Sequence, residues 1–405
     1  MGVGGILVSL IAAAISLVAL PALLALLGTR VNALSPKRWR RASERVASQE
    51  ATGLWYRVSR AVMRRPAVVA AVTAALLLLL GTQFLRIEFT GFSPQDLPQS
   101  TAPRQVDDVL RSEFPPNPTD SVIVAADAPR EARTEVKSLA MRARALDDVA
   151  RVEPPAYLGD DTWRLDVIPR GEPLDAGTQD LVRAIRSLDS TRELGVTGET
   201  ADFVDQQSSL GSRLPLGLAI VSLVTLVLLF LLTSSLVLPL KSLLMNVLTL
   251  SAAFGLLVLI FQDGRLEGVL SYESAGALEA TQPVLLFALV FGLSTDYAVF
   301  LLSRIKEARD AGLDDNEAVA RGLERTGRIV TAAAVLFCVA IGAFATSEVV
   351  FIKELGIGTA LAVIIDATII RALLVPALMA LLGRRNWWAP AALRRLHRRF
   401  GLGET

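Results

Sequence analysis

The sequence predicts a membrane α-helical bundle of about seven transmembrane helices, with one α+β domain outside the membrane. The chain is 52% hydrophobic and its mean hydropathy is +0.47. Soluble proteins contain roughly 45–50% apolar residues, so we expect an integral membrane protein. The apolar residues form blocks of about 18 to 28, close to the ~20 residues that cross a bilayer as a helix. One long segment between the second and third blocks is amphipathic instead.

The apolar blocks are the predicted membrane spans. They run approximately over Gly4–Leu27, Ala67–Leu85, Leu214–Leu232, Ser242–Phe261, Pro283–Ser303, Ile329–Thr346 and Leu355–Leu382. The first block lacks a basic leader and a convincing small-residue cleavage site. We therefore expect it to be a true span and not a cleaved signal peptide.

The distribution of arginine predicts the orientation of the chain. The segment Arg30–Arg65 carries ten Lys or Arg residues against Glu44 and Glu50, and short loops of this kind remain cytoplasmic. Residues 29–66 are therefore a predicted cytoplasmic linker. Counting spans from the linker places the N-terminus outside and the arginine-rich tail, residues 384–405, in the cytoplasm.

Residues 86–213 are long enough to form an extracytoplasmic domain. Their patterns predict strands and helices in the order βαββαβ, which is the ferredoxin-like arrangement. The strands are expected at Ser121–Ala126, Val149–Glu153, Thr162–Ile168 and Leu194–Thr197, and the helices at Arg130–Leu146 and Asp175–Leu188. A small binding domain and a simple stalk both fit this pattern.

An internal repeat is visible near the two ends of the chain. The sequence PALLALLG at Pro21–Gly28 recurs as PALMALLG at Pro376–Gly383. Leu- and Ala-rich helices can match by chance, but the shared Pro and Gly favour a true repeat. We therefore expect residues 1–28 to be the last helix of a preceding repeat. Residues 67–85 then begin a second repeat, which residues 214–383 complete with a five-helix region.

Three passages resemble the MMPL branch of the RND superfamily of transporters. They are SLVLPLKSLLMNVLTLSAAFG from Ser235, FGLSTDYAVFLLSRIKE from Phe291, and the segment Leu355–Gly383 that ends in VPALMALLG. The resemblance covers essentially the whole chain. It implies a multi-pass protein of the bacterial plasma membrane that uses the proton gradient to export a lipid or another hydrophobic substrate. Members of the family have two repeats and twelve spans, so the expected partner is a missing N-terminal half or a second copy.

Asp296 is the first candidate for chemistry. It lies about halfway along the fifth span, where an ionised carboxylate costs roughly 2.5–3.5 kcal/mol, so such a residue is a functional candidate. Ala288, Gly292 and Ser303 share its helical stripe and would allow another helix to approach. The alternative is a protonated acid that only locks two helices together. By resemblance, Asp296 and Tyr297 match the Asp-Tyr pair that relays protons in the family.

The chain departs from the family pattern at two points. No other Asp-Tyr dipeptide occurs in the sequence, so a relay that uses two such pairs would be incomplete within one chain. Many members also have Glu directly after the tyrosine, whereas this chain has Ala298.

Asp366 is the second intramembrane acid, with Arg371 five residues later. Two interpretations remain open, a buried ion pair and a secondary proton site. The preceding span predicts close helix packing, because small residues share one of its faces. They are Thr331, Ala334, Cys338, Gly342 and Ala345.

The composition excludes several other functions. A single cysteine and a single histidine exclude multi-cysteine metal sites and histidine clusters, and we find no phosphate-binding loop, no nucleic-acid motif and no catalytic triad. No cofactor and no enzymatic activity are expected. The basic linker and the segment Ala391–Phe400 fit either a helix on anionic membrane lipids or a simple cytoplasmic flank. Two other functions stay open, a lipid-sensing or scaffold protein that does not transport, and an RND motor that assists secretion.

Overall fold

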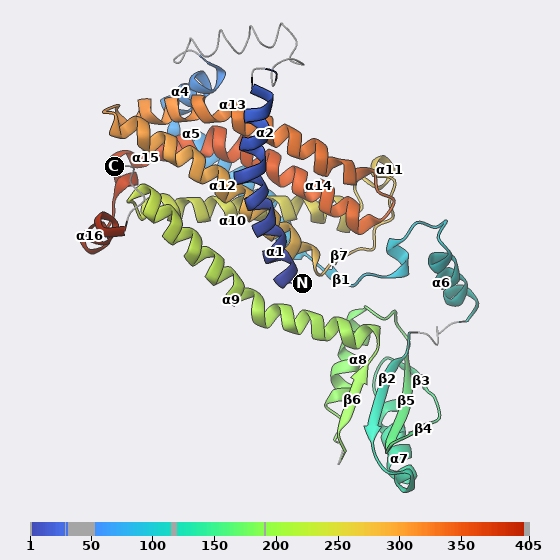
Figure 1. Ribbon diagram of the computed structural model, residues 1–405. Helices are drawn as coiled ribbons and strands as arrows, with labels where there is room; N and C mark the ends of the chain where they lie inside the picture. The colour runs from blue at the N-terminus through green and yellow to red at the C-terminus, as the bar shows by residue number, and fades with distance from the viewer. Residues whose placement is uncertain (1, 29, 31–52, 115–119, 190–191, 401–405) are drawn as a thin grey trace.

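The computed structural model describes residues 2–28, 30, 53–114, 120–189 and 192–400. A helical bundle occupies one end of the molecule and an α+β unit the other, joined by the long helix α9 (Glu199–Thr233) and by the segment after α5 (Pro66–Thr82) (Figure 1). Within the described residues, seven helices are long and apolar enough to cross a membrane, which confirms the predicted spans. They are Val3–Leu27, Pro66–Arg86, Glu199–Thr233, Val237–Gln262, Gln282–Asp310, Asp315–Thr346 and Val350–Trp387.

Several helices extend beyond their apolar blocks. The bundle contains α10 (Val237–Leu257), α12 (Gln282–Asp310), α13 (Asp315–Gly342), α14 (Val350–Ile365) and α15 (Val375–Leu382). Helix α13 begins with polar residues because Asp314 caps it, accepting a hydrogen bond from the Glu317 backbone N–H at 3.1 Å. Hydropathy locates the part of a helix that meets lipid, and capping determines where the helix starts.

Helices α5 and α10 approach each other closely at Gly255. A Cβ at Gly255 would lie 1.9 Å from the Leu80 carbonyl oxygen, so glycine is required for this approach. Leu77 and Ala252 pack in the same region and are fully buried. The α4 helix (Leu54–Arg64) lies across the end of the bundle farthest from the α+β unit (Figure 1).

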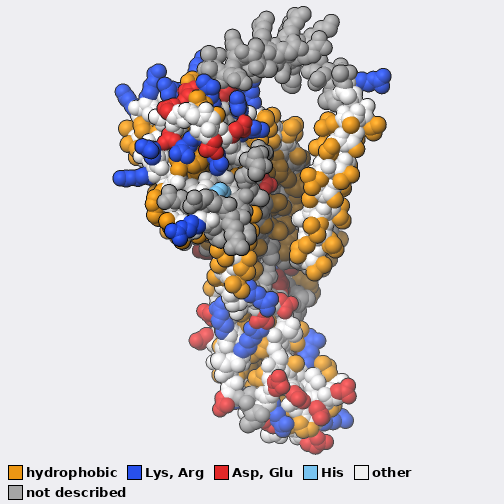
Figure 2. Space-filling model, turned by 60° about the vertical axis from the view of Figure 1, so that its left-hand side comes forward, with side chains coloured by type: hydrophobic (Ala, Val, Ile, Leu, Met, Phe, Trp, Pro, Cys, Tyr) orange, Lys and Arg blue, Asp and Glu red, His pale blue; other side chains and the backbone are white. Residues whose placement is uncertain are grey.

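The first apolar helix has no buried side chain. It consists of α1 (Gly2–Ala14), the π-helical segment η1 (Ile15–Ala19) and α2 (Leu20–Leu27), and residues 3–28 are all exposed. Figure 2 shows it as an orange column that stands beside the rest of the bundle.

The α+β unit has a five-stranded antiparallel sheet. Strands β2 (Val122–Asp127), β3 (Val149–Val152), β5 (Thr162–Pro169) and β6 (Leu194–Thr197) are ordered β3-β5-β2-β6, and β4 (Ala156–Gly159) also pairs with β5. Helices α7 (Arg133–Arg144) and α8 (Ala176–Arg186) cover one face, where alternate residues of β2 are buried against Leu139 and Leu181.

Strand β4 is an element that the sequence patterns missed. It forms a hairpin with β5 through Gly159, Asp160 and Asp161, all with positive φ, and Tyr157 packs on Trp163 with ring centroids 5.2 Å apart. The turn residues were evident, but the strand before them is too short to show an alternating pattern.

A short parallel ladder lies at the end of the bundle nearest the α+β unit (Figure 1). Strand β1 (Phe89–Thr90), which follows α5, pairs with β7 (Leu278–Glu279), which precedes α12. The polypeptide that leaves the bundle is thereby tied to the loop at the same end of the bundle.

The two PALxALLG segments have the same backbone form. Each follows a π-helical segment, η1 for α2 and η9 (Asp366–Leu374) for α15, and each ends at a glycine in the same unusual conformation. Gly28 has φ 48° and ψ −130°, and Gly383 has φ 48° and ψ −126°. The sequence match therefore extends to the geometry of both segments.

Candidate functional site

A buried ion pair lies inside the bundle. Asp366 and Arg371 are each 5% exposed, and the Asp366 Oδ2 accepts a hydrogen bond from Arg371 Nε at 2.8 Å and lies 2.7 Å from Nη2 in an ion pair. Both residues belong to the π-helical segment η9, whose i to i+5 bonding brings side chains five residues apart together. This geometry agrees with the interpretation of Asp366 and Arg371 as a buried ion pair.

Two further helices contribute polar groups to this pair. The Ser294 Oγ of α12 lies 3.0 Å from Asp366 Oδ1 and 2.7 Å from the Oδ1 of Asn246 on α10. A hydroxyl carries one proton, so it donates to one of these oxygens at a time. Arg371 Nη2 also donates to the Ser294 carbonyl at 2.8 Å. We call Asn246, Ser294, Asp366 and Arg371 the central polar cluster.

Tyr297 contacts the central polar cluster from α12. The guanidinium carbon of Arg371 lies 4.8 Å from the centroid of the Tyr297 ring, a cation–π distance. The sequence motif around Asp296 thus reaches the buried pair through its tyrosine.

Asp296 itself has a different environment. Its side chain is exposed, and among the described residues it makes no hydrogen bond or ion pair. Ala288 and Gly292 on the same stripe are exposed as well, and a Cβ at Gly292 would meet nothing within 4 Å. This stripe is therefore an uncovered face of α12 with a carboxyl group at its middle.

Lys241 of α10 lies next to the central polar cluster. It is 7% exposed, and its Nζ donates to Asn386 Oδ1 at 3.3 Å. A cavity of 30 Å³ is lined by Lys241, Ala298 and the central polar cluster. The side chain of Ala298 is small, so this space remains. A larger side chain at this position would fill it.

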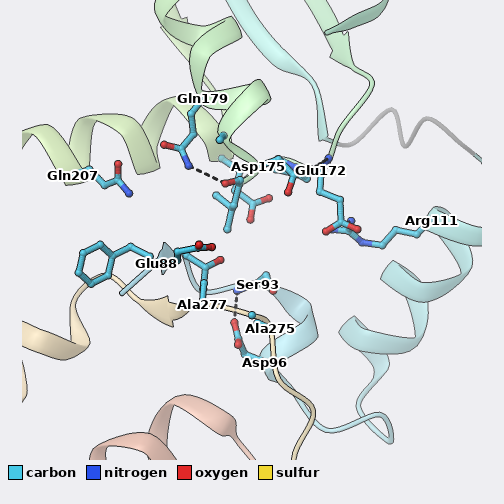
Figure 3. A pocket seen from close by; sticks show the side chains of 17 residues that line it. Glu88, Ser93, Asp96, Arg111, Glu172, Asp175, Gln179, Gln207, Ala275 and Ala277 are labelled. Atoms are coloured by element: carbon cyan, nitrogen blue, oxygen red, sulfur yellow. Dashed lines mark hydrogen bonds and ion pairs between the residues drawn. The ribbon is translucent and has the colours of Figure 1, made fainter. Parts of the chain in front are cut away.

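An open pocket lies between the α+β unit and the bundle, with a volume of 560 Å³. Figure 3 shows Glu172, Asp175, Gln179 and Gln207 on one side of it. Glu88, Ser93 and Asp96 lie on the opposite side, near the loop that contains Ala275 and Ala277. The pocket is polar and reaches the end of the bundle.

A family comparison agrees with these motifs. The model of the MMPL family matches residues 117–401. The chain belongs to the MMPL family. The match includes five of the seven apolar helices and the whole central polar cluster.

Relatives of this MMPL chain include named exporters. The chain is 37% identical to a membrane protein of Streptomyces coelicolor, over 96% of this chain and 53% of the relative. It is 34% identical to the trehalose monomycolate exporter MmpL3 of Mycobacterium tuberculosis, over 98% of this chain and 46% of the relative. The mycolic acid-containing lipids exporter MmpL11 of Mycolicibacterium smegmatis is 30% identical, over 98% and 42%. The chain thus spans about half the length of these relatives.

Sequence reasoning on this MMPL chain named Asp296, Tyr297, Asp366 and Arg371 but missed Asn246, Ser294 and Lys241. The structure brings Tyr297 to the Asp366–Arg371 pair and leaves Asp296 outside it. The signal for the missed residues was available, because each is a polar residue within an apolar helix and lies in a passage that resembles the family.

The small-residue face of α13 packs against α14 over part of its length. Ala334 is buried, and the Cys338 Sγ lies 3.7 Å from the Ala360 carbonyl, whereas Thr331 is exposed. Cys338 is half-buried and serves as a small packing residue.

The two basic flanks of the MMPL chain contain amphipathic helices. In α4 Trp55 packs on Gly327, and the Tyr56 backbone N–H donates to Glu324 at 2.9 Å, while Arg57 and Arg60 are exposed. In α16 (Ala391–Phe400) His397 packs edge-on against Phe230, and burial lowers the pKa of His397. Residues 31–52 of the predicted linker lie outside the described residues.

Proposed function

We propose that this chain is one repeat of an exporter that uses the proton gradient across the bacterial plasma membrane to move a lipid or another hydrophobic molecule. The family and two relatives that are named as lipid exporters support this class of substrate. Since the chain spans about half of these relatives, the complete transporter requires a second repeat or a second copy.

The central polar cluster carries the proposal. Charged groups within a membrane are costly and are retained where they have a role. Asp366, Arg371 and Ser294 connect η9 to α12, and Asn246 adds α10. Protonation of Asp366 removes its charge and weakens its bond to Arg371, which changes the polar contacts of η9 with α12 and α10. A proton on this carboxyl group would thereby change helix packing, which is what coupled transport requires.

Asp296 and Tyr297 extend this relay toward the partner repeat. An uncovered carboxyl group at the middle of a span is unfavourable in lipid. The small residues Ala288 and Gly292 beside it allow another helix to approach closely. We therefore place the missing half, or a second copy of the chain, against this face of α12, where Asp296 would complete the relay.

The proposed orientation places the α+β unit outside the cytoplasm. Figure 2 shows many Lys and Arg side chains on the end of the bundle away from the α+β unit, as the positive-inside bias requires of a cytoplasmic end. The N-terminus would then lie outside and the C-terminus inside. The strand order β3-β5-β2-β6 and the helices α7 and α8 support a ferredoxin-like domain. The shared backbone form at Gly28 and Gly383 supports the assignment of residues 1–28 to a preceding repeat.

The test is transport of a lipid in vesicles under an imposed pH gradient. We expect the chain with its partner half to move lipid only when the gradient is present, and the chain alone to transport poorly. Binding of lipid without movement in the complete assembly would favour a sensor or scaffold instead. Strong gradient-driven transport by the chain alone would show that two copies replace the missing half.

A further inference from the structure

A second group of carboxyl side chains lies at the end of the bundle nearest the α+β unit. Glu354, in the first turns of α14, is 4% exposed, and its Oε2 has no hydrogen-bond partner within the described part of the chain. Together with Asp96 and Glu279 it lines a small cavity of 10 Å³. A cavity of this size holds about one water molecule.

The polar groups around Glu354 bind other partners, so they do not compensate a charge on its carboxyl group. Glu279 is already engaged, because its Oε2 accepts hydrogen bonds from the backbone N–H groups of Thr281 at 2.9 Å and Gln282 at 3.0 Å. Lys353 is adjacent in sequence, but its Nζ donates to the carbonyls of Leu270 and Ser271.

The remaining groups nearby are also occupied. The Tyr272 hydroxyl donates to the Ile260 carbonyl, and Arg104 on α6 (Ala102–Glu113) pairs with Asp108 and Glu273. No ion pair of Glu354 occurs among the described residues, and no group of three or more His, Cys, Asp or Glu among them is arranged to hold a metal ion. The unpartnered carboxyl oxygen of Glu354 is a group that can take up a proton.

Asp96 lies between the small cavity and the open pocket. It lines both the 10 Å³ cavity and the 560 Å³ pocket, and in Figure 3 it lies on the bundle side of that pocket. Its Oδ2 accepts a hydrogen bond from the Ser93 backbone N–H at 2.7 Å. Burial raises the pKa of Asp96, which brings its titration closer to neutral pH.

The inner side of Glu354 is closed by apolar residues. Glu354 and Asp366 are twelve residues apart on one continuous helix, a rise of about 18 Å. The buried side chains of Leu257, Phe261, Leu286 and Phe291 and of Ala362 form one apolar cluster in this region. Between Glu354 and Asp366 this helix carries one polar side chain, the buried Thr359, whose hydroxyl has no hydrogen-bond partner within the described part of the chain.

We propose that Glu354 is the proton-loading site at the α+β end of the transporter, that Asp96 delivers the proton from the open pocket through the single-water cavity, and that the apolar cluster holds it there until the helices rearrange. The direction of this movement rests on the proposed function. In the loading step a proton passes from water to the Asp96 carboxylate and then to the Glu354 carboxylate, and Asp96 is regenerated.

Infrared spectroscopy of the chain in lipid vesicles tests the proposal without any transport. We expect a band of a protonated carboxyl group at neutral pH that is lost in Glu354→Gln and retained in Glu348→Gln, an exposed acid just before α14. After transfer to D₂O this band shifts as the proton exchanges. In Asp96→Asn we expect the exchange to be slower by about tenfold. A positioned acid–base group accelerates proton transfer by roughly 100-fold or more, and the loss here is smaller because water still reaches the pocket.

Two results would overturn the proposal. One is a band that is absent from the wild type or unchanged in Glu354→Gln. The other is an equal rate of exchange in the wild type and in Asp96→Asn. Asp96 is half-buried and lies outside the spans, so we expect Asp96→Asn to fold even if Glu354→Gln does not. Failure of gradient-driven transport in the wild type would contradict the proposed function instead, since the infrared measurement uses no gradient.

Discussion

Asp366 and Arg371 show how the energetics of a single residue depend on its partner. Each is buried, so either one alone would be an unpaired charge, whereas in the pair the two charges compensate each other through an ion pair and a hydrogen bond. The sequence predicted that these residues could pair. It did not predict that a π-helical segment provides the spacing, nor that Ser294 and Asn246 complete the cluster.

The first prediction distinguishes the contribution of the Asp366–Arg371 pair to stability from its contribution to proton coupling. Asp366→Asn leaves Arg371 unpaired, and we expect the free energy of unfolding to fall by about 3–5 kcal/mol. The double variant Asp366→Leu, Arg371→Met should recover most of that loss and still fail to couple transport to the gradient. Thermal unfolding in detergent measures the first effect. The control is Glu307→Gln in the exposed pair with Arg304, where we expect at most about 1 kcal/mol. Equal effects at the two sites would contradict the account.

The second prediction concerns the pH dependence of stability at Asp96. Burial raises the pKa of Asp96 above its ordinary value of 3.8, so the folded state binds this proton more tightly than the unfolded state. The contribution of Asp96 to stability is therefore greatest below pH 3.8 and falls as pH rises toward the raised pKa. Asp96→Asn should remove this fall and raise the melting temperature at neutral pH. The exposed Asp127→Asn is the control, and a lower melting temperature in Asp96→Asn at neutral pH would show that burial does not penalise the ionised Asp96.

At the scale of elements, the contact between α5 and α10 depends on one glycine. The third prediction is that Gly255→Ala destabilises the bundle by about 1–3 kcal/mol, because its Cβ would overlap the Leu80 carbonyl. Gly217→Ala in α9 is the matched control, since nothing lies within 4 Å of that Cβ. It should be neutral or stabilising by up to about 1 kcal/mol. Chemical denaturation of both variants provides the comparison, and a neutral Gly255→Ala would contradict this packing.

The elements that the sequence predicted are those with a strong period or a long apolar run. All seven spans are confirmed, and β2, β3, β5 and β6 lie where strands were expected. Hydropathy did not reveal the π-helical segments, because their apolar composition matches that of an α-helix. Strand β4 was missed because four residues between turn signals show no clear alternation. Which helix face is covered also depends on contacts, so the exposure of Asp296 could not be predicted from its stripe.

At the scale of the whole molecule, the fourth prediction concerns topology. In a Cys338→Ala background, a cysteine introduced at the exposed Ser187 of the α+β unit should react with an impermeant reagent added outside intact cells. A cysteine introduced at Ala311, in the turn between α12 and α13, should react only after the membrane is opened. The reverse pattern would overturn the orientation.

The uncovered face of α12 relates the role of single residues to the assembly of the transporter. Asp296 lies on that face and Tyr297 touches Arg371 behind it, so the motif joins the buried pair to the surface where a partner repeat would pack. Asp296→Asn keeps the size and hydrogen-bonding capacity of the side chain but removes the exchangeable proton, and a neutral amide costs less to bury than an ionised carboxylate. Insertion and assembly should therefore survive. Tyr297→Phe keeps the ring on Arg371 and should weaken coupling less.

The most direct test of proton coupling is the rate of lipid movement in vesicles that contain the complete transporter, with and without an imposed pH gradient, for the wild type and Asp296→Asn. We expect the gradient to accelerate transport in the wild type and to have no effect in Asp296→Asn, at equal amounts of inserted protein. Unchanged gradient-driven transport in Asp296→Asn would contradict the role of this residue and would leave Asp366 as the proton-carrying acid.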